Sequence, residues 1–134
     1  MIENQSQTYI SEKLLVLLPH SDDEIFLLDI ISSLKVRTSV EILLLSGCLK
    51  RKQESHLSAE MLGCKLFYAD TRGLKLKDGE FHKSVKQIYY FLNSLLKEYN
   101  AILTPALEGG HQDHDTVSLV TTFCLQDNKD INLY

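Results

Sequence analysis

Two short segments of the sequence, which we call the first and second chemical segments, are rich in imidazole and carboxylate side chains. The first is residues 19–24, with the sequence PHSDDE, and the second is residues 109–115, with the sequence GGHQDHD. Burying so many charged groups is costly unless they are compensated, and a divalent cation would compensate them. Two histidines and a carboxylate, with one position left open for water, form a recurrent ligand set of catalytic zinc, whereas closed structural sites usually contain cysteine. The two segments therefore favour a catalytic metal centre.

Five short apolar segments predict the strands that would position these groups. They cover residues 13–18, 40–45, 65–69, 101–104 and 131–134. Each is too continuously apolar for a sheet with one face in water, so we expect buried parallel strands. The first chemical segment follows the first strand and the second follows the fourth. Both should lie at the carboxyl edge of the sheet, where ligands bind near a switch point.

The segments between the strands have helical spacing. Apolar residues at helical spacing predict four helices. The inward-facing positions of the first are Ile25, Leu28, Ile31 and Leu34, and those of the second are Leu57, Met61 and Leu62. Those of the third are Val85, Ile88, Tyr89, Leu92, Leu95, Leu96 and Tyr99, and those of the fourth, over residues 115–125, are Val117, Val120 and Cys124. Asp78-Gly79 is a turn signal within the irregular residues 70–83. The alternation predicts an α/β fold, a Rossmann-like, mostly parallel sheet of about five strands with flanking helices. We expect one domain over residues 1–134, C-terminally shortened because nothing follows the last strand.

Composition narrows the classes of function. With 14 Lys and Arg against 18 Asp and Glu, the formal charge of −4 gives no broad basic surface, so we expect no nucleic-acid partner. No apolar run is long enough for a membrane span, and the polar residues 1–8 lack the apolar stretch of a signal peptide, which predicts a cytoplasmic protein. Cys48, Cys64 and Cys124 have apolar neighbours and no paired spacing, so we expect reduced core residues.

The two chemical segments resemble the Ala-His-Pro-Asp-Asp-Glu and His-x-Asp-His motifs of the zinc-dependent N-acetylglucosaminyl deacetylases, the LmbE-like or PIG-L family. Arg51 and Glu54 match the family's Arg-x-x-Glu, and Leu62-Gly63 and residues 75–79, which end in Asp-Gly, also match. The resemblance spans residues 14 to about 120. Ser21 replaces the usual proline and Pro19 the usual small residue, but neither position supplies a ligand.

The resemblance implies a role for each group in hydrolysis of an N-acetyl group from a GlcNAc-type sugar or glycoconjugate, or a related amide. The implied Zn²⁺ ligands are His20, Asp23 and His114. Asp22 would be the general base and His111 the electrophilic partner, which stabilises the oxyanion and protonates the leaving amine. Asp113 would orient a ligand, and Arg51 would contact the substrate.

Other interpretations use the same residues. Asp22 and Asp23 could cap a helix N-terminus, and Arg51 could form an i,i+3 ion pair with Glu54 on a solvated face. A receiver-like signalling domain would use Asp70 as phosphoacceptor, but leaves three histidines unexplained. A noncatalytic zinc-binding module is a further alternative. It would be completed by a second copy of the chain along the open strand edge, as a homo-oligomer.

Overall fold

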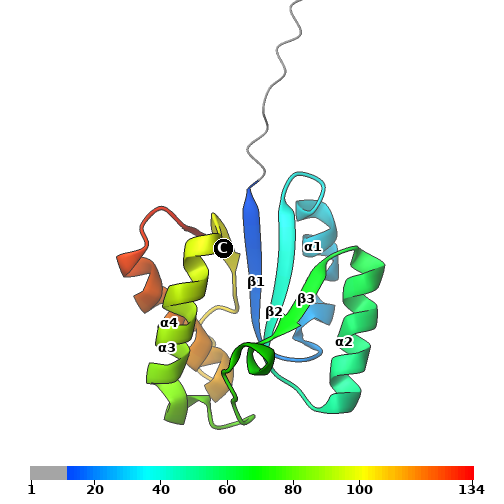
Figure 1. Cartoon of the computed structure of the whole chain (residues 1–134). Coiled ribbons are helices and arrows are strands. Elements are labelled where there is room, and N and C mark those ends of the chain that lie inside the picture. Colours follow the sequence, from blue (N-terminus) through cyan, green and yellow to red (C-terminus); the bar gives the residue numbers. More distant parts are fainter. Residues whose placement is uncertain (1–11) are drawn as a thin grey trace, which may run out of the picture.

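The computed structural model describes residues 12–134 and contains a five-stranded sheet (Figure 1). Residues 1–8, on which the expectation about a signal peptide rests, lie outside the described residues. The strands are β1 (Lys13–His20), β2 (Ser39–Ser46), β3 (Lys65–Tyr68), β4 (Ala101–Leu103) and β5 (Asn132–Leu133). Every pairing is parallel, in the order β3-β2-β1-β4-β5. The predicted Rossmann-like sheet is confirmed.

Helices cover both faces of the sheet (Figure 1). They are η1 (Asp23–Leu27), α1 (Leu28–Leu34), α2 (Leu49–Leu62), η2 (Ala69–Arg72), η3 (Phe81–Ser84), α3 (Val85–Leu95), η4 (Leu96–Glu98) and α4 (Gln112–Asp127), where η denotes a 3₁₀ helix. One apolar core joins the sheet to α3 and α4, and the other joins its opposite face to α1 and α2. The protein is therefore a three-layer α/β structure.

The central strand β1 is apolar along its length because it contributes to both cores. Leu15 and Leu17 pack toward α3 and α4, whereas Leu14, Val16 and Leu18 pack toward α1 and α2. Successive side chains of a strand point to opposite faces, so burial of both faces requires a continuous apolar run. This continuity made the strands recognisable in the sequence.

All four predicted helical segments are present, but several of the expected inward positions are exposed. In α3 and α4 most predicted inward positions, among them Ile88, Leu92 and Val117, are buried, but Val85 at the start of α3 is 43% exposed. In α2, however, Leu57 and Met61 are 62% and 90% exposed. The residues of α2 that are buried are Ser55, Ala59 and Leu62. The inward face of α2 is thus formed mainly by small side chains, which a search for apolar periodicity overlooks.

The first helical segment is wrong at one position, for a different reason. Ile31 is fully buried as expected, but Ile25 is 52% exposed. Ile25 lies in the 3₁₀ helix η1, which precedes α1. A 3₁₀ helix has three residues per turn instead of 3.6, so its side chains do not continue the face of the α-helix that follows.

The strand order identifies one edge as the functional one and excludes the receiver-like alternative. β1 lies between β2 and β4, so successive connections leave it in opposite directions, and its carboxyl end is the switch point at the lower edge in Figure 1.

A receiver-like order would place β3 beside β1. Here β2 separates them, and Asp70, just after β3, pairs with Lys52.

The cysteines are all free, but they do not share one environment. Cys124 is buried, Cys64 is half-buried and Cys48 is exposed. Burial raises the pKa of the Cys124 thiol to about 11. The expectation of a core residue is thus wrong for Cys48, which lies in the connection after β2. No helix within residues 12–134 has the length and apolar character needed to cross a membrane.

Candidate metal centre

His20 ends β1 and points into the carboxyl edge of the sheet, with 12% of its side chain exposed. Its Nε2 lies 2.8 Å from Oδ2 of Asp113. An ionised carboxylate can only accept a hydrogen bond, so Nε2 donates to it. The other ring nitrogen, Nδ1, lies 3.6 Å from Oδ2 of Asp23. The tautomer set by Asp113 therefore leaves Nδ1 to face the centre of the site.

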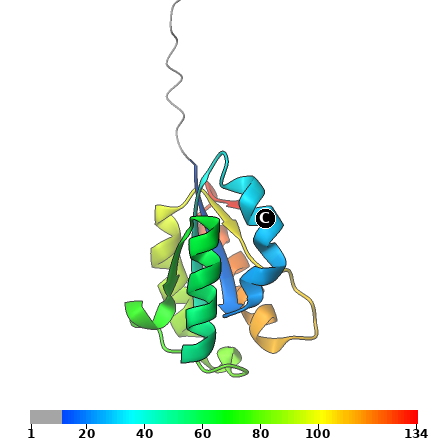
Figure 2. The same cartoon turned by 90° about the vertical axis from the view of Figure 1, so that its right-hand side faces the viewer.

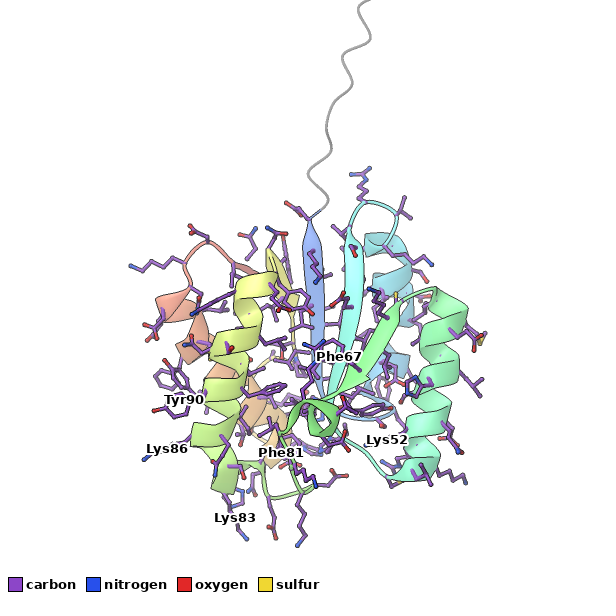
Figure 3. All side chains as sticks on the ribbon, in the orientation of Figure 1. Lys52, Phe67, Phe81, Lys83, Lys86 and Tyr90 are labelled. Atoms are coloured by element: carbon purple, nitrogen blue, oxygen red, sulfur yellow. The ribbon has the colours of Figure 1, made fainter. Side chains whose placement is uncertain are left out.

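Asp113 is fully buried in the first turn of α4 and is held by three donors. Besides His20, the backbone N–H groups of Gly79 and Phe81 donate to its carboxylate, the latter at 3.1 Å. Burial alone would raise the pKa of Asp113, but these donors outweigh it and hold the pKa below its usual value. Phe81 lies at the lower end of the sheet beside α3 (Figure 3). Asp113 thus connects β1, α4 and the loop before α3.

The turn after β1 sends two adjacent carboxylates in different directions. Asp22 has a left-handed backbone conformation, with φ of 85°, which aspartate tolerates better than most residues. Oδ2 of Asp23 accepts the backbone N–H of His20 and lies 3.4 Å from Nε2 of His114. Oδ2 of Asp22 instead lies 3.4 Å from Nε of Arg51 in α2.

These contacts decide two of the alternatives drawn from the sequence. The side chain of Asp22 makes no capping hydrogen bond to η1, so simple helix capping does not account for it. The ion pair recorded for Arg51 within residues 12–134 joins it to Asp22 and not to Glu54. Arg51 is 55% exposed and lies at the rim of the site.

Glu24 supports this turn from inside the protein. It is fully buried, and its Oε2 accepts the backbone N–H of Asp22 at 2.9 Å. Its Oε1, together with the hydroxyls of Ser21 and Ser55, is buried with no hydrogen-bond partner among the described residues. Glu24 therefore holds the backbone of the left-handed residue Asp22 in place from inside the protein.

The second chemical segment brings two more imidazoles to the same point. His111 directly precedes α4, and His114 lies in its first turn. Their ring centroids are 4.2 Å apart, and the ring of His20 lies 5.2 Å from His111 and 5.5 Å from His114. The preceding loop is folded back by Asp115, whose Oδ1 accepts the backbone N–H groups of Glu108 and Gly109.

The electrostatics of the centre suit a cation. Burial alone would lower the pKa of His20, but the carboxylates of Asp23 and Asp113 outweigh it and raise the pKa above its usual value. For Asp23, burial would raise the pKa, and the interactions with His20 and His114 hold it below its usual value. The site therefore favours a positive charge between these groups, which a proton or a metal ion can supply.

The donor set also fits a divalent metal. Ligand atoms of His20, His111 and His114 all lie within 4.8 Å of one another, and Asp23 approaches two of these rings. Nδ1 of His114 is buried without a hydrogen-bond partner among residues 12–134, and the carboxylate of Glu108 lies 3.7 Å from it. Imidazole and carboxylate donors are the usual ligands of catalytic zinc. The structure thus brings together His111 and the three residues predicted as ligands.

Sequence reasoning missed the loop that supports Asp113. From the sequence, Asp78-Gly79 is interpreted as a turn and as the end of a stretch that matches the family, without a role in the site. In the structure, Asp78 accepts a hydrogen bond from Ser46 at the end of β2. Gly79, with φ of 80°, turns its N–H toward Asp113. Backbone donors have no residue type of their own, so the sequence carried no direct signal for this contact.

Comparison with known proteins shows that the chain matches one family model and is similar in fold to several solved structures. The family model described as GlcNAc-PI de-N-acetylase, PIG-L, matches residues 15–124. N,N'-diacetylchitobiose deacetylase from Pyrococcus horikoshii is 20% identical with a TM-score of 0.69, covering 93% of this chain and 53% of that one. A conserved protein from Thermus thermophilus is 20% identical with a TM-score of 0.68, covering 91% and 64%.

A triple mutant of a deacetylase involved in the teicoplanin biosynthetic pathway is 17% identical with a TM-score of 0.72, covering 89% of this chain and 62% of that one. At these identities the likeness concerns the fold. The chain spans about half to two thirds of the length of these three structures. No curated protein sequence matches it.

Proposed function

The chain belongs to the PIG-L family, that of GlcNAc-PI de-N-acetylase, and from this premise we propose that it is a zinc-dependent N-deacetylase. Its substrate would be a GlcNAc-type sugar or glycoconjugate, from which it removes the N-acetyl group, or a related amide. The observation that carries the proposal is the convergence of His20, Asp23 and His114 at the switch point of the sheet. The deacetylases among the similar structures support the same class of reaction.

The proposed metal ligands are Nδ1 of His20, Oδ2 of Asp23 and Nε2 of His114, the atoms that face one another at 3.4 and 3.6 Å. A bound zinc would polarise the amide carbonyl and acidify water at the site. Asp113 keeps the proton of His20 on Nε2, so that Nδ1 is free to bind. The low pKa of Asp113 keeps this acceptor ionised at neutral pH.

Asp22 is the proposed general base. Its carboxylate is only partly exposed, and Arg51 holds it on the α2 side of the centre. A carboxylate within hydrogen-bonding reach of the attacking water can accept its proton, and such catalysis typically contributes about 10²- to 10⁴-fold. Glu24 fixes the backbone from which this side chain projects.

His111 and Arg51 complete the proposal on the exposed side. His111, in its protonated form, would donate to the oxyanion of the tetrahedral intermediate and then pass its proton to the leaving amine. Its position before α4, 4.2 Å from the ring of His114, supports this role. Arg51, exposed at the rim, is the proposed contact for the polar part of the substrate.

The second candidate is a noncatalytic domain that binds metal at the same residues without turnover. A second copy along the open strand edge would then complete the site. Zinc binding without release of acetate would favour this candidate.

Replacing Asp22 by Asn tests the proposed mechanism. The amide keeps the size of the side chain but cannot accept the proton, so acetate release from an N-acetylglucosaminide should fall at least about 100-fold. The zinc content should not change, because Asp22 is not a proposed ligand. Asp29→Asn, an exposed change in α1, is the matched control. Turnover retained in Asp22→Asn would remove Asp22 as the base.

A further inference from the structure

A cavity of about 390 Å³ lies beside the metal centre, between η1 and the loop that follows β4. Its apolar walls come from Leu18, Phe26, Leu27, Leu103 and Pro105. Figure 2 shows the loop after β4, coloured gold to orange, on the same side of the sheet as η1 and α1 in blue. The cavity therefore occupies the β1–β4 side of the switch point.

The metal centre forms one wall of this cavity. Asp23 and His114, two of the proposed ligands, line it directly. Asp22 and Arg51 do not line it, because the left-handed turn directs Asp22 toward α2. A substrate amide at the centre would thus have a polar, charged surface on one side and an apolar cavity on the other.

The chemistry of the walls indicates which part of the substrate enters. A sugar ring carries hydroxyl groups, and burying a hydroxyl without a partner is costly. Apart from the two proposed ligands, the polar lining residues are only Thr104 and Glu108, and the side chain of Glu108 is 55% exposed. The cavity therefore suits an apolar group better than a sugar.

Its size indicates how large that group is. Pockets that enclose drug-sized ligands measure about 300–1,000 Å³, and this cavity falls within that range. The methyl group of an acetyl would fill only a small part of it. An apolar chain of several carbons, joined to the carbonyl at the metal centre, would fill much more of this volume.

We propose that this cavity binds the acyl chain of the substrate, and that the preferred substrate is an amino sugar or related amine carrying an N-acyl group longer than acetyl. The inference rests on the proposed function, because it places the scissile amide at the His20, Asp23 and His114 centre. The amine part then faces Arg51, and the acyl chain lies against Phe26 and Leu103. The reaction remains hydrolysis of the amide, in which water supplies the oxygen of the released fatty acid and a proton of the amine.

Calorimetric binding of N-acetyl- and N-octanoylglucosamine to the purified chain tests the inference. Burial of a methylene group contributes about 0.8 kcal/mol, so the first added methylenes should each tighten binding about fourfold. Phe26→Ser should reduce the preference for the octanoyl compound, because it removes an apolar wall that is 86% exposed and not needed for the core. Phe123→Ser, on an exposed face of α4, is the matched control.

The same compounds, assayed for release of acetate or octanoate, separate the two proposals. Equal binding of both compounds, or equal loss of binding in both serine variants, would overturn the acyl cavity. Release of acetate without any preference for the octanoyl compound would contradict the proposed acyl-binding cavity but support the proposed deacetylase activity. Release of neither acid, with octanoyl binding still dependent on Phe26, would overturn the hydrolase and support the cavity.

Discussion

The two segments that form the candidate metal centre are attached to the protein in opposite ways. Residues 20–24 are integrated into the core, where Ser21 and Glu24 are buried and the backbone N–H of Ser21 donates to Ser46 of β2. Residues 106–112 lie on the surface and are exposed, including His111. Asp113 is the exception in the second segment, because it is buried and bonded to His20.

This difference assigns different tasks to the two segments. Groups on the buried segment are held in place by the folded core before any ligand arrives. Exposed loops have fewer contacts and lower local stability, so the proposed contact of His111 with a substrate would allow adjustment of the loop. Asp113 couples the two, since its carboxylate joins the buried β1 end to the helix that carries His114. Substitutions in the buried segment, in the exposed segment and at Asp113 should therefore change the free energy of unfolding by unequal amounts.

The largest effect is expected from Asp113→Ala. The change leaves His20 and the N–H groups of Gly79 and Phe81 without their acceptor. An unsatisfied buried group costs about 1–3 kcal/mol, so we expect a loss of at least about 3 kcal/mol in the free energy of unfolding. Urea denaturation of the metal-free protein measures it. A loss below about 1 kcal/mol would contradict the coupling role of Asp113.

Acid titration sharpens the same comparison. Because the pKa of Asp113 is lower in the folded protein than in the unfolded chain, its contribution to stability is complete above its unfolded pKa of about 4. It is lost as the pH falls through the folded pKa. The stability difference between the wild-type protein and Asp113→Asn should therefore shrink below about pH 4. A difference that grows in acid would contradict this sign.

A smaller effect is expected from Glu24→Ala, which removes the acceptor for the N–H of Asp22. We expect a loss of about 2 kcal/mol in the free energy of unfolding, from the lost hydrogen bond and the space left behind. Glu24→Gln is the matched control, because its amide oxygen can still accept that N–H. Equal losses in the two variants would show that the hydrogen bond to the N–H of Asp22 does not account for the stabilisation by Glu24.

The smallest effect is expected in the exposed segment, from Asp115→Ala. Its Oδ1 accepts the N–H groups of Glu108 and Gly109, which water can reach once they are freed. We expect a loss of about 1 kcal/mol or less, of the size seen for capping residues. Amide hydrogen exchange at these two residues should accelerate while β1 stays protected. Equal acceleration in β1 would contradict the independence of the loop.

The sequence was sufficient for the central strands β1 and β2, which are buried on both faces and read as continuous apolar runs. The expectation of a buried strand was wrong for residues 131–134, because Asn132 and Leu133 of β5 are exposed at the edge of the sheet. The sequence also placed the two chemical segments together, since carboxyl ends of parallel strands share one edge. It failed for α2, whose buried face is made of residues such as Ser55 and Ala59. Small side chains do not mark a buried face by apolar periodicity.

Within the site, side chains could be predicted but their supports could not. His20, Asp23 and His114 have residue types that suggest metal binding, and they do converge. The donors to Asp113 are backbone groups of Gly79 and Phe81, 34 and 32 residues away in sequence. The cavity arises from the packing of separate elements, so neither feature has a local signature in the sequence.

The most direct test of the metal centre is a zinc titration of the metal-free protein, followed by mass-spectrometric metal analysis. The wild-type protein and His56→Ala, a change at an exposed histidine of α2, should each bind one zinc per chain. His114→Ala should bind it on the order of 100-fold more weakly, because a ligand is lost. Equal zinc affinity in all three proteins, or binding in none, would contradict the assignment of the centre to His20, Asp23 and His114.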